Sequence, residues 1–211
     1  MTPETQALVR SATASAAVPF VPEVTLRTAA EPFGLWDRTE RDAPPFWAFP
    51  WAGGQGLARY VLDHPAEVAG RFVLDFGAGS GLVAIAAAKA GAAGVLAAEI
   101  DHFAAAAIAI NATLNKVAVT VTTADVIDTT DSRWEVVAAG DVCYEQPMAT
   151  RVARWLAALA RRGSLVLLGD PGRAYLPANC LRERARYLVP TSRELEDRDT
   201  RDGVVWEVLP S

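Results

Sequence analysis

The sequence predicts an α/β fold with a seven-stranded, mostly parallel sheet, helices on both faces and an antiparallel hairpin at the C-terminus. Short, almost continuously apolar runs alternate with helical segments from residue 71 onward, which is typical of parallel strands covered on both faces. A glycine-rich turn, "FGAGSG", joins the first of these strands to a helix. The charged run "EDRDTRDG" separates two apolar segments near the C-terminus, as a hairpin turn does. Together these features indicate a Rossmann-like arrangement.

Before the alternating region, the chain is less regular. Residues 6–17 are expected to form a short helix and residues 23–27, "EVTLR", an edge strand. Residues 31–55 are rich in proline, glycine and aromatic side chains, which favours a structured loop over a linker. An amphipathic helix over 56–68 is expected to close at His64-Pro65.

The alternating elements follow in a regular order. Strands are expected at 71–77, 94–101, 117–125, 134–142 and 164–171, and helices at 80–91, 102–115 and 147–161. The C-terminal hairpin is expected to pair residues near 187–195 with 203–209. We expect an N-terminal extension over residues 1–45 and one domain over 46–211.

Composition excludes several functional classes. The chain has 211 residues, 51% of them hydrophobic, and a formal net charge of −5 without a basic run, so neither nucleic acid nor an anionic membrane is an expected partner. Cys143 and Cys180 lack metal-ligand spacing, and the two histidines are His64 and His102, so no metal site is expected.

The expected location is the bacterial cytoplasm. No apolar run is long enough to span a bilayer. The first residues contain Glu4 and have Arg10 as their basic residue, which resembles neither a signal peptide nor an organelle transit segment. The abundance of alanine, and of arginine over lysine, is typical of a GC-rich bacterial coding bias.

The glycine turn is compatible with two kinds of cofactor. Gly79-x-Gly81-x-x-Ala84 satisfies the dinucleotide fingerprint, and Glu99 ends the next strand, where a ribose-binding acid belongs. Asp75 argues against a dinucleotide, because a carboxylate just before the glycines would repel a pyrophosphate. It suits the ammonium and sulfonium of S-adenosylmethionine, which we therefore expect, with a dinucleotide or a turn without ligand as alternatives.

Two further strand ends carry candidate residues. Asp125 follows the third strand, where its carboxylate can accept from an adenine amino group and the amide of Val126 can reach a ring nitrogen; the alternative is a helix or turn cap. Asp141 and Tyr144 follow the fourth strand, "AAGDVCYE". Ligands of open α/β sheets bind at this edge, so we expect Asp141 and Tyr144 at the reacting centre. The alternative is a strand-end turn with a surface tyrosine.

The aromatic segment before the turn also has two interpretations. Phe46, Trp47, Phe49 and Trp51 either cap the open end of the core or enclose the methylene stem and cationic head of a lysine. The following pair Gly53-Gly54 would let the backbone approach a cofactor closely.

Several stretches resemble one family. "VPEVTLRTAAEPFGLW", "PPFWAFPWAGGQGLARYVLDHP", "VLDFGAGSGLVAIAAAKAGA", "VLAAEID", "GDVCYE" and "LLGDPGR" resemble, in this order and over roughly residues 20–180, the electron transfer flavoprotein β-subunit lysine methyltransferases. These are seven-β-strand enzymes that depend on S-adenosylmethionine. The D-x-x-Y from Asp141 to Tyr144 resembles the motif that this group places at the substrate lysine.

The resemblance implies a role for most candidate residues. The implied catalytic residues are Asp141 and Tyr144. The expected substrate-binding residues are Phe46 and Trp47, from the aromatic segment, and Arg173, which follows the fifth strand at the same edge of the sheet. The implied cofactor-binding residues are Trp51, Gly53, Asp75, Gly77, Gly79, Gly81, Glu99, Ile100, Asp125, Val126 and Asp141.

The expected activity is methyl transfer to protein lysines, with the electron transfer flavoprotein β-subunit as substrate and partner. A methyltransferase acting on a ribosomal protein or a small amine is the alternative enzyme. A non-enzymatic subunit that binds S-adenosylmethionine and regulates a partner is the third possibility. Asp141 is expected to capture and aim the lysine rather than to act as a strong base.

Overall fold

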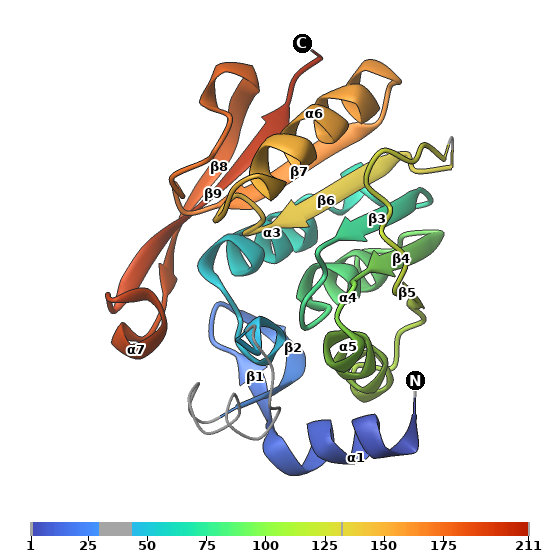
Figure 1. The fold of residues 1–211 in the computed structure, drawn as a ribbon, viewed down its shortest axis with the longest axis vertical. Helices are drawn as coiled ribbons and strands as arrows, with labels where there is room; N and C mark the ends of the chain where they lie inside the picture. The colour runs from blue at the N-terminus through green and yellow to red at the C-terminus, as the bar shows by residue number, and fades with distance from the viewer. Residues whose placement is uncertain (1, 30–43, 132, 211) are drawn as a thin grey trace.

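The computed structural model describes residues 2–29, 44–131 and 133–210. The strands of its main sheet are β3 (Phe72–Phe76), β4 (Gly94–Ala98), β5 (Thr120–Thr122), β6 (Val136–Gly140), β7 (Leu165–Asp170), β8 (Leu181–Pro190) and β9 (Thr200–Val208). They lie in the order β5-β4-β3-β6-β7-β9-β8 (Figure 1). The first five are parallel, and β9 runs antiparallel to both β7 and β8. The predicted seven-stranded sheet with its C-terminal hairpin is confirmed.

This strand order positions the site. From β3 the chain moves outward to β4 and β5, then returns to add β6 on the other side of β3. The connections after β3 and β6 therefore leave the sheet in opposite directions, and the carboxyl ends of these two strands border a crevice. Asp75 lies near the end of β3, and Asp141 follows β6 directly.

Helices cover both faces of the sheet. On one face lie α3 (Ala52–Asp63), α4 (Leu82–Lys89) and α5 (His102–Leu114), and α6 (Met148–Arg161) covers the other. The helices α4 and α5 are rich in alanine and apolar nearly all round, so each can pack on the sheet and on further layers. By contrast, α6 is amphipathic: its buried face includes Trp155, whose Nε1 donates to Thr129 O at 2.8 Å.

The N-terminal residues pack onto this core. They form α1 (Pro3–Ala12) and a separate antiparallel pair, β1 (Ala14–Val18) and β2 (Val21–Thr28). The expected helix over 6–17 is wrong beyond Ala12, because pairing with β2 outweighs the helix propensity of the alanines in β1. The strand expected at 23–27 is present as β2, although in this pair rather than in the main sheet. The expected boundary between an N-terminal extension, residues 1–45, and the domain, residues 46–211, stays a prediction.

Two other expectations are corrected. The helix α3 begins at Ala52, not at residue 56, so the predicted loop includes its first turn. Residues 191–195 are not strand: β8 ends at Pro190 and a four-residue helix, α7 (Arg193–Glu196), lies within the connection to β9. Residues 31–43 of the expected aromatic loop lie outside the described residues.

Short 3-10 helices complete the described elements: η1 (Phe46–Ala48), η2 (Pro65–Glu67) and η3 (Ala178–Cys180). Among the described residues, no helix has the length and apolar character needed to cross a membrane.

Candidate active site

Several backbone amides of the glycine turn after β3 donate hydrogen bonds within the protein. Gly77, Gly79 and Gly81 have φ angles of 63°, 52° and 82°, which side chains disfavour. The amides of Gly77 and Ala78 donate to Ala98 O at 3.0 and 3.2 Å, and that of Gly79 donates to Glu99 Oε2 at 2.9 Å. A pyrophosphate site needs such amides directed at the ligand. The amides of Gly77, Ala78 and Gly79 are therefore not directed at a ligand, which disfavours the dinucleotide alternative.

Asp75 places a buried carboxyl group beneath this turn. Its side chain is 1% exposed, and Oδ2 accepts from the amide of Ala84 in the first turn of α4 at 2.8 Å. Burial, with a smaller contribution from the negative charge of Glu99, raises the pKa of Asp75 to about 7, against the effect of the Ala84 amide. A bound cation would favour the ionised form of this carboxyl group.

Glu99 is held at the end of β4 by backbone amides. Besides the bond from Gly79, Oε1 accepts from Asp101 N at 3.0 Å. Burial raises the pKa of Glu99, and these amides partly offset the rise. Each carboxylate oxygen has a second lone pair, so Glu99 can still accept from a ribose hydroxyl. The neighbouring Ile100 is 68% exposed, an apolar surface beside this acid.

A small cavity lies between the glycine turn and the aromatic segment. Its volume is about 50 Å³, and its lining includes Asp75, Asp141, Gly54, Phe46 and Trp51. Trp51 Nε1 donates to Phe46 O at 2.8 Å, which holds the segment together. Pockets for cofactor-sized ligands usually measure about 300–1,000 Å³, so this cavity can hold only part of a nucleoside cofactor.

Asp141 occupies a constrained position at the end of β6. Its φ is 57°, and its amide donates to Gly169 O at 2.8 Å. Oδ2 accepts from Gly54 N at 2.7 Å, while Oδ1 accepts from Nη2 and Nε of Arg173 at 2.7 and 3.2 Å. Burial raises the pKa of Asp141 to about 6, and the Arg173 guanidinium limits the rise.

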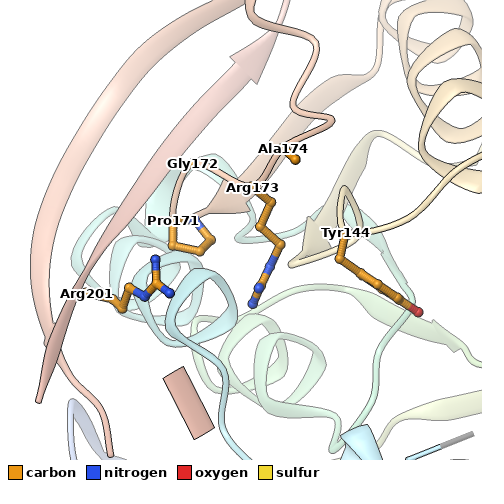
Figure 2. Close-up of a pocket in the computed structure, with 6 residues that line it drawn as sticks. All are labelled: Tyr144, Pro171, Gly172, Arg173, Ala174 and Arg201. Atoms are coloured by element: carbon orange, nitrogen blue, oxygen red, sulfur yellow. The ribbon is translucent and has the colours of Figure 1, made fainter. Parts of the chain in front are cut away.

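A second, more open hollow lies next to this ion pair. Its volume is about 220 Å³, and it is lined by Tyr144, Pro171, Gly172, Arg173, Ala174 and Arg201 (Figure 2). Tyr144 is 41% exposed, with its ring centroid 5.6 Å from that of Phe46. Because Asp141 lines the first cavity and Arg173 the second, their ion pair connects the two. The structure thus brings together six of the candidate site residues: Asp75, Asp141, Tyr144, Arg173, Phe46 and Trp51.

Trp47 is placed differently from what the sequence predicted, whereas the predicted role of Asp125 is not tested. The Trp47 side chain is 2% exposed and lies in a core cluster with Val9, Ala104 and Ile110, so it does not face a substrate. The alternative interpretation, an aromatic cap on the core, describes Trp47. Asp125 pairs with Arg151 Nη1 at 3.0 Å and accepts from the amide of Ile127, while Val126 is buried. Their contact with adenine stays a prediction.

Sequence reasoning missed Glu196. This residue of α7 is 4% exposed; Oε1 accepts from Ala52 N at 3.4 Å, and Oε2 lies 3.4 Å from Arg201 Nε. In the sequence it is one acid within a charged run that looks like a solvated turn, so no pattern identifies it. Asp170, at the end of β7, was also missed: Oδ1 accepts from the amides of Gly172 and Arg173, both at 2.7 Å.

Comparison with known proteins identifies the family. A model of the ribosomal protein L11 methyltransferase family (PrmA) matches residues 60–143. The electron transfer flavoprotein beta subunit lysine methyltransferase of Mus musculus is 34% identical over 198 residues, 90% of this chain and 78% of that protein. The protein of the same name from Danio rerio is 36% identical, over 88% of this chain and 75% of that protein. The chain belongs to this lysine methyltransferase family.

Solved structures agree on the fold. Magnesium protoporphyrin IX methyltransferase from Synechocystis, with bound S-adenosylmethionine, has a TM-score of 0.55 at 18% identity and covers 75% of this chain and 80% of its own. The 16S rRNA methyltransferase RsmC from T. Thermophilus has a TM-score of 0.58 at 16% identity, and the match covers 93% of this chain and 50% of that one.

The enzyme is thus a protein-lysine methyltransferase, and its cofactor is S-adenosylmethionine. The site fits that cofactor, because two buried carboxyl groups, Asp75 and Asp141, line the cavity beside the glycine turn and can face its cationic methionine end.

Proposed function

We propose that this enzyme methylates lysine side chains of the electron transfer flavoprotein β-subunit. The observation that carries the proposal is the position of Asp141, a buried carboxylate between the cofactor cavity and an open hollow beside Tyr144. A lysine ammonium entering through the hollow would meet this negative charge before it reached the cofactor cavity. The names of the family members supply the identity of the substrate.

Each cofactor-binding residue has a proposed role. Asp75 and the three turn glycines hold the methionine end, with Asp141 on the far side of the same cavity. Glu99 holds the ribose and Ile100 lies against the nucleoside, while Asp125 and the Val126 amide recognise adenine. Trp51 covers the cofactor, and Gly53 allows α3 to lie close to it.

The protein must also deliver the lysine as a neutral amine. When bound, S-adenosylmethionine supplies an electrophilic methyl group. Deprotonating a lysine of pKa ~10.4 near pH 7.4 costs about 4 kcal/mol at roughly 1.36 kcal/mol per unit. Desolvation between Phe46 and Tyr144 lowers that cost. With its pKa raised only to about 6, Asp141 serves mainly to capture and aim the ammonium.

A ribosomal protein is the second candidate substrate. The match of residues 60–143 to the ribosomal protein L11 methyltransferase model favours it. That match ends at Cys143, before Tyr144 and Arg173 at the substrate side, so it bears mainly on the cofactor half of the site.

The cellular setting is proposed on composition alone. An acidic chain with a formal net charge of −5 favours a protein partner over nucleic acid or membrane. A bacterial, cytoplasmic enzyme stays a prediction from the arginine- and alanine-rich sequence. The relatives named above are animal proteins and give it no support.

The test is incubation with radiolabelled S-adenosylmethionine and, in parallel, purified electron transfer flavoprotein, purified L11 and a small alkylamine. We expect label in the β-subunit, on lysine by mass spectrometry. Label only in L11 would establish the second candidate, and label only in the amine would establish a small-molecule methyltransferase. Cofactor binding without any transfer would indicate the regulatory subunit.

A further inference from the structure

Arg173 lies between two buried carboxylates. Its Nη2 is 2.7 Å from Asp141 Oδ1 and 3.6 Å from Glu196 Oε1. Its guanidinium carbon lies 5.7 Å from the centroid of the Trp51 ring, within the range of a cation–π contact. In the view of Figure 2, the Arg173 side chain lies between those of Arg201 and Tyr144. One cation thus contacts residues from the aromatic segment, the end of β6 and α7.

The Arg173 guanidinium lies where the ammonium of a substrate lysine would approach Asp141. A substrate ammonium aimed by Asp141 would lie beside the same carboxylate and in the same aromatic surroundings as the Arg173 guanidinium. Two cations at hydrogen-bond distance in a site of low dielectric repel each other strongly. Arg173 and the substrate lysine therefore compete for Asp141.

Glu196 offers Arg173 a second partner. Its carboxylate is buried and held in place from two sides, by the amide of Ala52 at the start of α3 and by Arg201. Arg201 also donates to the backbone oxygen of Glu196 at 3.2 and 3.0 Å, which fixes α7 itself. At 3.6 Å the Arg173–Glu196 contact is longer than a direct hydrogen bond, so a small shift of the guanidinium would strengthen it.

We propose that Arg173 occupies the cation position at Asp141 until the substrate lysine displaces it, and that Glu196 receives the displaced guanidinium. The inference rests on the proposed lysine methylation. Arg173 and Glu196 are positioning residues in this scheme, and they set specificity. A lysine on a docked protein brings binding energy that can drive the exchange, whereas a free amine does not.

The experiment compares Glu196→Gln, Arg173→Gln and the double variant. The dissociation constant of the unmethylated β-subunit is measured by calorimetry with S-adenosylhomocysteine present, so that no turnover occurs, alongside KM and kcat. We expect Glu196→Gln to weaken substrate binding and raise KM about tenfold, the scale of one charged hydrogen bond, with a smaller change in kcat. Arg173→Gln should bind substrate at least as tightly as wild type, and the effect of Glu196→Gln should vanish in its background.

Controls separate this scheme from a structural role. Asp199→Asn changes an exposed ion pair with Arg193 in the same connection between β8 and β9. It should alter neither the dissociation constant of the substrate nor KM. Thermal melts check each fold, and Arg173→Ala replaces Arg173→Gln if the latter unfolds. Equal weakening by Glu196→Gln with and without Arg173, or weaker substrate binding by the Arg173 variants, would overturn the inference. A wild-type enzyme that transfers no methyl group to the β-subunit would instead overturn the proposed function, and this inference with it.

Discussion

Gly53 is the tightest point between α3 and the catalytic strands, and its substitution gives a sharp prediction. A Cβ on Gly53 would lie 2.4 Å from Gly169 O and 2.7 Å from Asp141 Oδ2. The first of these atoms is backbone, so rotating a side chain cannot relieve the clash. Alanine gains about 1 kcal/mol of helix propensity over glycine. Overpacking costs about 1–3 kcal/mol, and a clash with backbone belongs in the upper part of that range, about 2–3 kcal/mol. We therefore expect Gly53→Ala to lose about 1–2 kcal/mol of stability net.

The matched control is the next residue. At Gly54 a Cβ would meet only Asp141 Oδ2, at the ordinary contact distance of 3.8 Å. Thermal denaturation should show the melting temperature of Gly53→Ala lowered by roughly 2–8 °C, and that of Gly54→Ala unchanged or raised by a few degrees. Transfer activity should fall in Gly53→Ala, because relief of the clash moves Asp141. Equal melting temperatures and full activity in both variants would refute the packing argument.

Three further outcomes are expected. Calorimetry should show that Glu99→Ala weakens S-adenosylmethionine binding by about 1–3 kcal/mol, and unchanged affinity would place the ribose elsewhere. Because burial raises the pKa of Asp75 to about 7, and its ionised form holds a cation, cofactor affinity should rise between pH 6 and 8. Because the pKa of Asp75 is raised in the folded state, its protonated form stabilises the cofactor-free enzyme at low pH, and this contribution is lost as the pH rises through 7. Asp75→Asn should flatten both the pH profile of cofactor affinity and the pH profile of stability. Asn111 joins the amide of Arg27 to Ser80 O, both at 2.9 Å, so Asn111→Ala should lower stability by about 1–3 kcal/mol in a denaturant titration. A change in the free energy of unfolding of less than a few tenths of a kcal/mol would show that other groups replace the hydrogen bonds of Asn111.

The main sheet was predictable because its signals are local. Apolar runs of strand length alternate with helical segments, and the glycines with positive φ mark the first turn. The strand β1 in the N-terminal segment was not predictable, since its alanines favour a helix on their own and form a strand only by pairing with β2. The early start of α3 was missed for a similar reason. Its glycines look like a loop, whereas they permit close packing against β7 and β9.

The site shows the same division. Asp75, Glu99 and Asp141 were found because strand ends and motif spacing identify them. The partners of Asp141 were not found, because its contacts with Gly54 and Arg173 join residues 87 and 32 positions apart. The contact between Ala52 and Glu196 spans 144 positions and was missed for the same reason. Trp47 was assigned to substrate because composition alone does not tell which aromatic side chains of a segment face the core. Its neighbours Phe46 and Trp51 line the cavity, while Trp47 packs toward α1 and α5.

The central claim is that Asp141 aims the substrate lysine, and single-turnover methyl transfer by Asp141→Asn tests it most directly. Asparagine keeps the shape and one acceptor but removes the charge that attracts an ammonium into a dry pocket. Measured with thermal melts and cofactor titration on the same variant, transfer to the β-subunit should fall about a hundredfold or more, while the fold and most of the cofactor affinity remain. Near-normal transfer by a stable Asp141→Asn enzyme would contradict the account.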